Sequence, residues 1–555
     1  MWRFASLSRT RNALDSLECD LQAAPSGAAF FCVSRSSFLG TIDSMRAVVV
    51  GTGAGSLASA LRLRALGHEV DVVDACPDAG GRARSFLFHG HAFDAGPTVI
   101  TAPWLFDELF ELFGESRHER IEFLACDPWY RILYADGTEM DLVPSIERQE
   151  REIAKLSPED ASKYRRFLEH SERLYAVGYE QLGDTDFSSL AAMISTLPAL
   201  ARLGGFTTLW RHTAKYFSDP RIRQAFSLPT LLVGGNPITT TAIYGLIHAM
   251  ERKGGIWFAR GGTSRLIESL VSLGKRHGIR FHFNSKVVQF TTDSHRRITS
   301  MDVLNNGERK SFQCDLAVWG GDPRTLYSTL DNRLLSLTER LRVQTVSSSM
   351  GLYVLYFKTR RAYSDVAHHT IVLSKRWEEL LSEIFHGSDL PPDPSLYLHR
   401  PAATDPSMRF SDCDLFYVLA PVPHLGLYDS WRHEEDRFRK TVLAILEERA
   451  LPGLQAELEF AESVDPRYFR DTLMSPLGAG FSIAPVLSQS AWGRFHNRMD
   501  RVPNLYLCGA GVHPGGGLPG VVTSAKVVER LVRNDFPTSS SGKIGEFVAH
   551  TRAVA

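Results

Sequence analysis

A pair of glycines and a downstream carboxylate form the first group of residues whose types and spacing could serve chemistry. In the segment VVVGTGAGSL (48–57), Gly51 and Gly53 follow a short apolar run, and Asp74 lies 23 residues beyond Gly51. We expect Gly51 to permit a tight turn, Gly53 to let the backbone approach a pyrophosphate, and Asp74 to accept ribose hydroxyls. Ser56 stands where this fingerprint usually has its third glycine, so the match is incomplete. A solvated carboxylate at a strand end is the alternative for Asp74.

A second glycine-rich segment, near the other end of the chain, repeats this arrangement. It reads NLYLCGAGVHPGGGLPGV (504–521) and combines an apolar run, a glycine turn and a helix-like stretch, as in a site for a nucleotide pyrophosphate. Gly80, Gly81 and Arg82 follow the first segment, and an arginine there could pair with phosphate through its planar fork. A surface loop is the alternative for this triplet. FDAGPTVI (93–100) adds another glycine turn.

The elements that would position these residues follow a strand–helix–strand pattern. The sequence predicts a buried strand at 47–50, a helix at 57–66 and a second strand at 70–73 that ends at Asp74. Asp136-Gly137 predicts a hairpin turn. Elsewhere we expect mainly helices over 155–255, strands from Gly278 onward in IRFHFNSKVVQF, ITSMDVL and LAVWGG, and a helix over 430–450.

Composition sets limits on the class of protein. The chain has 555 residues, of which 44% are hydrophobic and 23% charged, which is ordinary for a globular protein of two or three domains. The net charge of −1 gives no reason to expect a nucleic-acid partner. The seven cysteines lie far apart without CxxC spacing, so we expect neither a disulfide framework nor a metal site. This cysteine pattern fits a reducing compartment.

Two long stretches without charged residues stand out in the middle of the chain. They cover 187–201 and 224–250, and neither contains Asp, Glu, Lys or Arg. Pro198, Pro229 and the GGNP sequence at 234–237 interrupt them, which argues against one continuous membrane helix. They are either buried core, or the wall of a lipid channel or a surface that dips into a bilayer.

The two ends of the chain differ from the rest. Residues 1–44 lack lysine and show no clear periodicity, so we expect a disordered or artefactual extension, with the working protein starting near Met45. Targeting is the alternative, because four arginines fit a transit peptide whereas four acidic residues do not. The tail 536–555 is polar, and we expect it to be flexible.

The motifs together resemble a known family. VVVGTGAGSLASALRLRALGHEVDVVD, GGRA and FDAGPTVIT are similar to the N-terminal half-site of the flavoprotein amine oxidase and carotenoid desaturase superfamily. Within it, 218–266, 395–407, 416–426 and 487–526 resemble phytoene desaturases of the bacterial and fungal type. The resemblance covers about 45–535.

The resemblance implies FAD as the cofactor, held non-covalently by both ends of the chain. By motif, the pyrophosphate would be surrounded by Gly51, Gly53, Gly55 and Ser56, and the adenosine ribose would be bound by Asp74. The other implied contacts are Gly81 and Arg82 on the phosphate–ribityl path, Val287 at the adenine, and Gly509, Ala510, Leu518, Pro519, Gly520 and Val521 along the pyrophosphate, ribityl chain and isoalloxazine, with a helix from about Val522. Two residues depart from the family pattern, Ser56 for glycine and Asp74 for glutamate.

The implied reaction removes two hydrogens from a bond flanked by double bonds. We expect a hydride to leave an allylic carbon for the flavin N5 and a proton to leave the neighbouring carbon. No catalytic residue is established by motif; His513 is the one polar side chain we nominate, and a structural hydrogen bond is its alternative. The implied partners are phytoene, a membrane contacted peripherally through 187–250, and a quinone or oxygen as electron acceptor, in the cytoplasm.

Other functions fit the same scaffold. A carotene isomerase, a C30 desaturase, a hydroxycarotenoid desaturase and a non-catalytic isoprenoid-binding protein all remain open. The expected fold class is α/β, with a Rossmann-like FAD-binding domain and a discontinuous substrate domain that carries a helical, membrane-facing region. The predicted FAD-binding parts are 45–130, 256–330 and 486–535, and the predicted substrate-domain parts are 131–255 and 331–485.

Overall fold

The computed structural model describes residues 44–410 and 412–537. The predicted extension 1–44 and the predicted tail 536–555 therefore lie almost wholly outside the described residues. Five cysteines among the described residues are free thiols. Within the described ranges, no helix combines the length and apolar character needed to cross a membrane.

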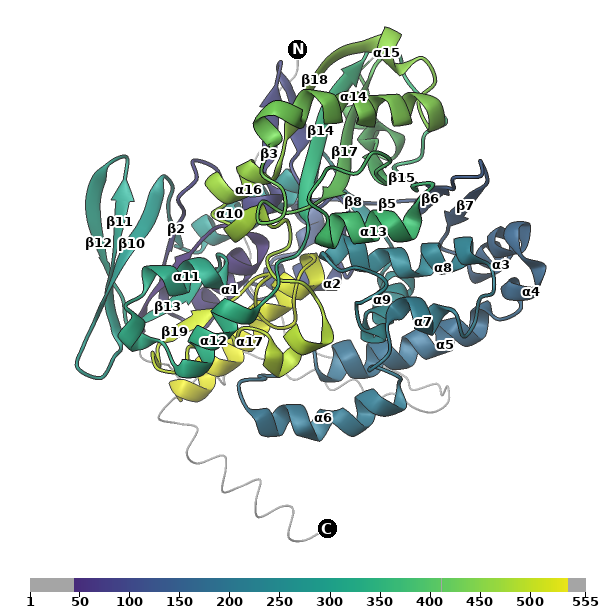
Figure 1. Ribbon diagram of the computed structural model, residues 1–555. Coiled ribbons are helices and arrows are strands. Elements are labelled where there is room, and N and C mark those ends of the chain that lie inside the picture. The colour runs from purple at the N-terminus through teal and green to yellow at the C-terminus, as the bar shows by residue number, and fades with distance from the viewer. Residues whose placement is uncertain (1–43, 411, 538–555) are drawn as a thin grey trace, which may run out of the picture. The chain divides into compact units, whose positions relative to one another are not determined.

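A five-stranded parallel sheet is assembled from distant parts of the chain (Figure 1). In spatial order its strands are β19 (Leu505–Leu507), β13 (Leu316–Trp319), β1 (Arg46–Val50), β2 (Glu69–Val73) and β9 (Arg280–His282). Every neighbouring pair is parallel, so the carboxyl ends of the strands meet at one edge of the sheet. Ligands bind at this edge in open α/β sheets.

Both faces of this sheet are buried, which explains the unbroken apolar run of β1. Val49 packs on the side of α1 (Ala54–Ala65), α2 (Trp104–Glu111), α10 (Thr263–Arg276) and α17 (Leu518–Asp535). Val48 packs on the opposite side, against the antiparallel ribbon of β10 (Ser285–Thr292), β11 (Ile298–Asn305) and β12 (Glu308–Gln313) and against α11 (Pro323–Thr329). Successive side chains of a strand point to opposite faces, and here each face has an apolar partner.

A second, seven-stranded sheet has one face covered and one face turned to the inside of the molecule. Its order is β18 (Leu458–Val464), β14 (Gly351–Thr359), β17 (Asp414–Val422), β16 (Leu396–His399), β15 (His369–Val372), β6 (Tyr130–Leu133) and β7 (Glu139–Leu142). Tyr353 and Leu355 pack beneath α14 (Trp431–Arg449), whereas Leu352 and Val354 belong to the core on the other face.

A series of short helices lies between β7 and β8 along the chain and appears in blue in Figure 1. They are α3 (Ile146–Leu156), α4 (Pro158–Ala161), α5 (Tyr164–Tyr175), α6 (Leu190–Arg202), α7 (Leu209–Thr213), α8 (Pro220–Ser227) and α9 (Leu246–Gly254). The remaining α-helices and β-strands are β3 (Ser85–Phe88), β4 (His91–Asp94), β5 (Phe123–Ala125), β8 (Trp257–Ala259), α12 (Leu337–Thr345), α13 (Trp377–His386), α15 (Leu454–Glu457) and α16 (Pro466–Asp471).

Most predicted elements are present, and two helix starts are corrected. The hairpin at Asp136-Gly137 joins β6 to β7, and Gly137 has a φ of 82° that suits such a turn. Helix α1 begins at Ala54 rather than at residue 57, directly after the glycine turn. Helix α17 begins at Leu518 rather than near Val522, so residues 518–521 form its first turn instead of a loop. The mixed α/β class is confirmed, while the domain boundaries stay a prediction.

Candidate active site

One cavity of about 550 Å³ is lined by both glycine segments. The edge of the five-stranded sheet forms one end of it, and the inner face of the seven-stranded sheet lines another part. All of the residues that the sequence nominates for the cofactor line it: Gly51, Gly53, Gly55, Ser56, Asp74, Gly81, Arg82, Val287, Gly509, Ala510, Leu518, Pro519, Gly520 and Val521. The structure therefore brings together residues up to 470 positions apart, and their binding roles stay predictions.

The two glycine segments touch each other through backbone atoms at Gly55. A Cβ on Gly55 would lie 2.9 Å from the carbonyl oxygen of Val521 and 3.3 Å from Cα of Gly509. At Gly53, by contrast, no protein atom lies within 4 Å of the position that a Cβ would take. Gly55 is thus needed for contact between the segments, and Gly53 leaves a clear approach to the backbone.

Ser56 fits at the third position of the fingerprint because of a glycine that the sequence analysis did not single out. The Ser56 hydroxyl lies 3.4 Å from the carbonyl oxygen of Val50, under the end of β1. A Cβ on Gly320, just past the end of β13, would collide with that hydroxyl. The absence of a side chain at Gly320 therefore makes room for the extra atoms of Ser56.

Two helices begin at the cavity without side-chain caps. The residues before them, Gly53 for α1 and Gly517 for α17, supply no side-chain acceptor, and neither first turn carries an acidic residue. The first N–H groups of a helix have no partner within the helix and carry the positive end of its dipole. Together these two helix starts suit an anion such as a pyrophosphate.

Asp74 and Arg82 are held by different neighbours. Asp74 ends β2, and its carboxylate accepts hydrogen bonds from the backbone N–H of Thr52 at 2.7 Å and from the N–H of Cys76 at 2.8 Å. The Arg82 guanidinium instead donates to the carbonyl oxygen of Gly480 at 2.6 Å and to the Ser475 hydroxyl at 3.2 Å. In this structure Arg82 braces the 475–480 loop, and its predicted phosphate contact stays a prediction.

The rest of the cavity has mainly apolar walls. Strand β14 contributes Leu352 and Val354, and β17 contributes Leu419, each with the next residue turned to the opposite face of the sheet. Helical segments supply the facing wall through Leu228, Leu231, Leu232, Ile243, Leu246 and Ile247. All of these helical residues fall in the uncharged stretch 224–250, so that stretch lines a cavity.

Comparison with known proteins decides the family. The model of the flavin-containing amine oxidoreductases matches residues 57–528. The chain belongs to this family. It is 41% identical over 495 residues to the "Phytoene desaturase (lycopene-forming)" of a Paracoccus species, covering 89% of this chain and 98% of that one. The "Phytoene desaturase (neurosporene-forming)" of Cereibacter sphaeroides is 37% identical over 503 residues, covering 88% and 95%. The resemblance to phytoene desaturases is thereby confirmed.

A solved structure supports the fold of this flavin-dependent oxidoreductase. An oxidoreductase from Methanosarcina mazei matches with a TM-score of 0.61 at 17% identity, over 88% of this chain and 100% of that chain. The prediction of FAD as the cofactor is confirmed by the family. The fit of the site agrees with it, because two uncapped helix starts, a clear approach at Gly53 and the fixed carboxylate of Asp74 match the pyrophosphate and ribose of a dinucleotide.

His513 lies in the cavity wall of this oxidoreductase, but its ring is engaged. Its Nε2 is 2.9 Å from the carbonyl oxygen of Leu182, and the ring meets Phe187 edge-on at 4.8 Å between centroids. Burial lowers the pKa of His513 to about 4, so the imidazole is neutral at pH 7 and donates through Nε2. This hydrogen bond supports the structural alternative, while a chemical role for His513 stays a prediction.

A polar group in the cavity wall was missed by the sequence analysis. Glu251 on α9 and Tyr130 on β6 both line the cavity, and the Tyr130 hydroxyl donates to Oε1 of Glu251 at 3.2 Å. Burial raises the pKa of Glu251 to about 8. The uncharged stretch used as a signal ends at Met250, one residue before this carboxylate.

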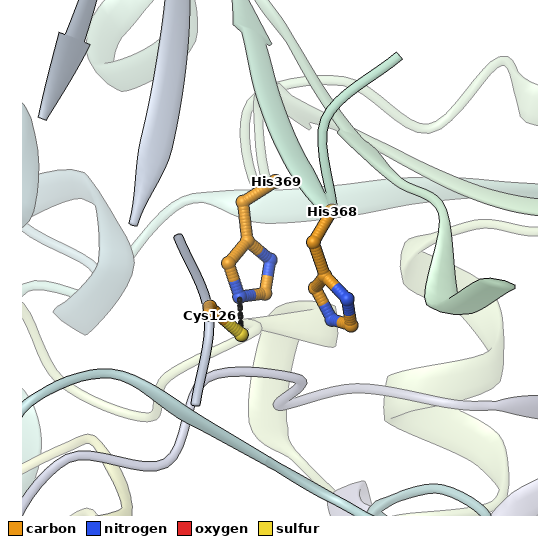
Figure 2. Close-up of side chains that lie close together, drawn as sticks. All are labelled: Cys126, His368 and His369. Carbon is orange, nitrogen blue, oxygen red and sulfur yellow. Dashed lines mark hydrogen bonds between the residues drawn. The ribbon is translucent and has the colours of Figure 1, made fainter. Parts of the chain in front are cut away.

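A buried group of imidazole and thiol side chains supports another polar residue of the wall, Tyr397. The Tyr397 hydroxyl lies 2.5 Å from the Thr98 hydroxyl and 2.6 Å from Nδ1 of His369. Figure 2 shows His369, His368 and Cys126 grouped together, with the Cys126 thiol next to the His369 ring at 3.9 Å. Burial lowers the pKa of both histidines, so the rings are neutral, and the Nδ1 atom of His369 holds the Tyr397 hydroxyl in place.

Proposed function

We propose that this protein is an FAD-dependent carotenoid desaturase that introduces double bonds into phytoene, towards neurosporene or lycopene. The observation that carries the proposal is that one cavity is lined both by the residues predicted to hold the dinucleotide, here called the cradle, and by apolar walls. A phytoene molecule is a long hydrocarbon, and such a chamber matches its chemistry. The names of the two desaturase relatives support the same substrate class.

The cavity walls bind the substrate, align it and exclude water. FAD, when bound, supplies the two-electron chemistry by accepting a hydride. Alternate side chains of β14 and β17 contribute apolar surface to the cavity, against which the hydrocarbon chain of the substrate can lie. Positive charge that develops in the polyene is delocalised, so the apolar walls suffice around it, and holding the reacting carbon in one place supplies much of the rate enhancement.

Pigment formation tests the proposal. The protein is expressed in cells that accumulate phytoene, and the absorption spectrum of the extracted pigments is recorded. We expect coloured cells whose spectrum identifies the number of conjugated double bonds, and therefore the product. Cells that stay colourless while containing FAD-bound protein would contradict the desaturase function.

The same experiment separates the remaining candidates. A carotene isomerase would change the geometry of a coloured precursor without adding double bonds, and a C30 or hydroxycarotenoid desaturase would act only when given that substrate. A non-catalytic isoprenoid-binding protein would be purified without flavin colour. Stoichiometric FAD in the purified protein would therefore remove that last candidate.

We further propose that the protein takes its substrate from a membrane surface through α6. Leu190 and Ile194, on one face of α6, have exposed fractions of 51% and 57%, and Phe206 just after the helix is 53% exposed. Thr196 and Leu200, on another face of the same helix, line the cavity. One short helix thus joins an exposed apolar surface to the chamber, as a peripheral membrane contact for an insoluble substrate requires.

Liposome flotation tests the membrane contact. We expect the double variant Leu190→Glu/Ile194→Glu to lose most of its binding to liposomes while keeping its FAD. The matched control is Leu337→Glu/Leu341→Glu on α12, where the exposed fractions are 63% and 51% but neither residue lines the cavity. Equal flotation of the α6 variant and the wild type would contradict the proposal. Reoxidation of the reduced enzyme by a quinone or by oxygen identifies the electron acceptor.

A further inference from the structure

Glu251 is a carboxylate on an otherwise apolar helix face. Leu246, Ile247, Met250 and Glu251 of α9 all line the cavity, and the first three are hydrophobic. Only 1% of the Glu251 surface is exposed. A buried carboxylate without a cationic partner costs several kcal/mol when ionised, so its presence in this wall needs an explanation.

The two oxygens of Glu251 differ in their hydrogen bonds. Oε1 accepts the Tyr130 hydroxyl at 3.2 Å, and Oε2 is buried without any hydrogen-bond partner. The neighbouring Arg252 does not satisfy it, because the Arg252 guanidinium donates to the carbonyl oxygens of Val143 at 2.7 Å and Pro144 at 2.8 Å. The structure therefore leaves one carboxylate oxygen free beside the chamber.

Each oxygen of the other carboxylates in the cavity wall accepts at least one hydrogen bond. Among the described residues, Asp74 and Asp322 are the two other acids that line the cavity. Both oxygens of Asp74 accept backbone N–H groups, and Asp322 is paired with Arg324 at 3.1 Å and with the Ser482 hydroxyl at 2.7 Å. Among the described acids of this wall, Glu251 is the one with an oxygen that has no hydrogen-bond partner.

We propose that Glu251 is the general base of the desaturation, accepting on Oε2 the proton that leaves the substrate carbon next to the hydride donor, with Tyr130 as its positioning residue. This inference rests on the proposed function. The torsion that turns a terminal carboxylate is soft, so Oε2 can face a substrate that fills the chamber. The Tyr130 hydroxyl holds Oε1 and favours the ionised form.

The step balances without any further reactant. One C–H bond of the substrate breaks with its electron pair leaving as a hydride for FAD, which is reduced by two electrons. The neighbouring C–H bond breaks with its electron pair becoming the new C=C bond, and its proton forms an O–H bond on Glu251. The protonated carboxyl then loses that proton to water before the next turnover.

The surroundings of Glu251 bring its pKa close to physiological pH. Burial raises the pKa of Glu251 to about 8, and it outweighs the Tyr130 hydroxyl on β6 and the Arg252 guanidinium on α9, which both lower that pKa. Tyr164 on α5 is a further titratable group nearby, and Glu251 raises its pKa. A general base works best when its pKa lies near the operating pH. The rate of desaturation should therefore rise with pH up to about 8 and then level off.

The experiment compares Glu251→Gln with the wild type in the FAD-bound protein. We expect equal FAD content and equal phytoene binding, a turnover that falls on the order of 10²–10⁴-fold, and loss of the pH-dependent limb. Infrared difference spectra between pH 6.5 and 9.5 add a readout that does not depend on turnover: a protonated-carboxyl C=O band should disappear in the wild type and be absent from the variant. Glu339→Gln is the control, because Glu339 is also buried but caps α12 outside the cavity.

Tyr130→Phe tests the positioning role. Loss of its hydrogen bond removes a contact that favours the ionised carboxylate, so the pH profile should move to higher pH while FAD binding is unchanged. Glu251→Asp, which keeps the carboxylate, should retain more turnover than Glu251→Gln. Wild-type turnover in Glu251→Gln would overturn the inference alone. Absence of product from the wild type would overturn the proposed function, and the inference with it.

Discussion

Gly55 and Val521 approach each other so closely that no side chain fits between them. A Cβ on Gly55 would lie 2.9 Å from the carbonyl oxygen of Val521, at the point where helix α1 meets the first turn of α17. The close packing of two residues 466 positions apart thus requires that Gly55 has no side chain. This contact joins the two glycine-rich segments that line the cavity.

Gly55→Ala should therefore destabilise the protein even without FAD. The added methyl group must displace backbone on α17, and overpacking of this kind typically costs about 1–3 kcal/mol. Gly53→Ala is the matched control, because its Cβ would meet no protein atom within 4 Å and would instead stand in the FAD approach. We expect the Tm of the apoprotein to fall for Gly55→Ala and to be unchanged for Gly53→Ala, while both lose FAD affinity. An unchanged apoprotein Tm for Gly55→Ala would contradict this account.

Ser56 and Gly320 should behave as a coupled pair. Gly320→Ala places a methyl group against the Ser56 hydroxyl and should lower the Tm, whereas Ser56→Gly alone removes only a weak 3.4 Å contact with the Val50 carbonyl. In the double variant the space left by the hydroxymethyl group accepts the new methyl group, so part of the lost stability should return. A double-mutant cycle on Tm or denaturant midpoint measures the coupling, which is about 0.5–3 kcal/mol for residues in contact. Strictly additive effects would contradict the pairing.

The residues proposed for the cofactor site could be nominated from the sequence because their signals are local, and the structure places them in one cavity. Gly51, Gly53 and Asp74 belong to one strand–helix–strand unit, in which spacing along the chain determines spacing in the fold. Gly320 could not be found in this way, because its role depends on the pairing of β13 with β1, which brings it next to Ser56. Likewise, the glycines and the proline around Leu518–Val521 led to the prediction of a loop, although proline in the first turn is compatible with the start of a helix.

Glu251 illustrates a different limit of sequence reasoning. Several residues of the uncharged stretch 224–250 line the cavity, but Glu251 follows directly after that stretch and therefore lay outside the pattern. The functional interest of Glu251 comes from the missing partner of Oε2 and from the direction of Tyr130, which lies 121 residues away. Neither property has a pattern in the chain.

Acid should destabilise the protein over a pH range set by its buried histidines. Burial lowers the pKa of His513 and of His212 from 6.5 to about 4, so the folded state binds fewer protons than the unfolded state between these values. Stability is therefore fully present above about pH 6.5 and falls as the pH drops towards 4, by roughly 3 kcal/mol for each such histidine. We expect the Tm of the FAD-saturated protein to decrease steadily from pH 7 to 5.

The control for this pH dependence is His513→Gln, whose side-chain amide nitrogen lies at the level of Nε2, so it can still donate to the Leu182 carbonyl but does not titrate in this range. Its Tm should decrease less steeply with falling pH than that of the wild type. The variant should also keep its turnover if the ring has only a structural role. A wild-type Tm that does not change between pH 7 and 5 would contradict the argument, and loss of turnover with normal FAD content would restore a chemical role for His513.

Metal analysis tests the prediction that the chain has no metal site. One sulfur and two imidazole nitrogens, from Cys126, His368 and His369, lie within 4.8 Å of one another and form a candidate metal site among the described residues (Figure 2). We nevertheless expect no stoichiometric zinc, because burial raises the pKa of the Cys126 thiol to about 12 and zinc is bound by the thiolate. The hydroxyl of Tyr397 already gives His369 a partner, and His399 lies 3.0 Å from Nε2 of His368.

Elemental analysis of the FAD-bound protein, after dialysis against buffer with and without added zinc, measures this directly. A second readout is Cys126→Ser, which should change neither metal content nor Tm by more than a small amount, because the thiol makes only a 3.9 Å contact with His369. One zinc per chain that is lost in Cys126→Ser would contradict the prediction. Such a result would also turn the second hydrogen bonds of His368 and His369 into the outer contacts that orient metal-bound histidines.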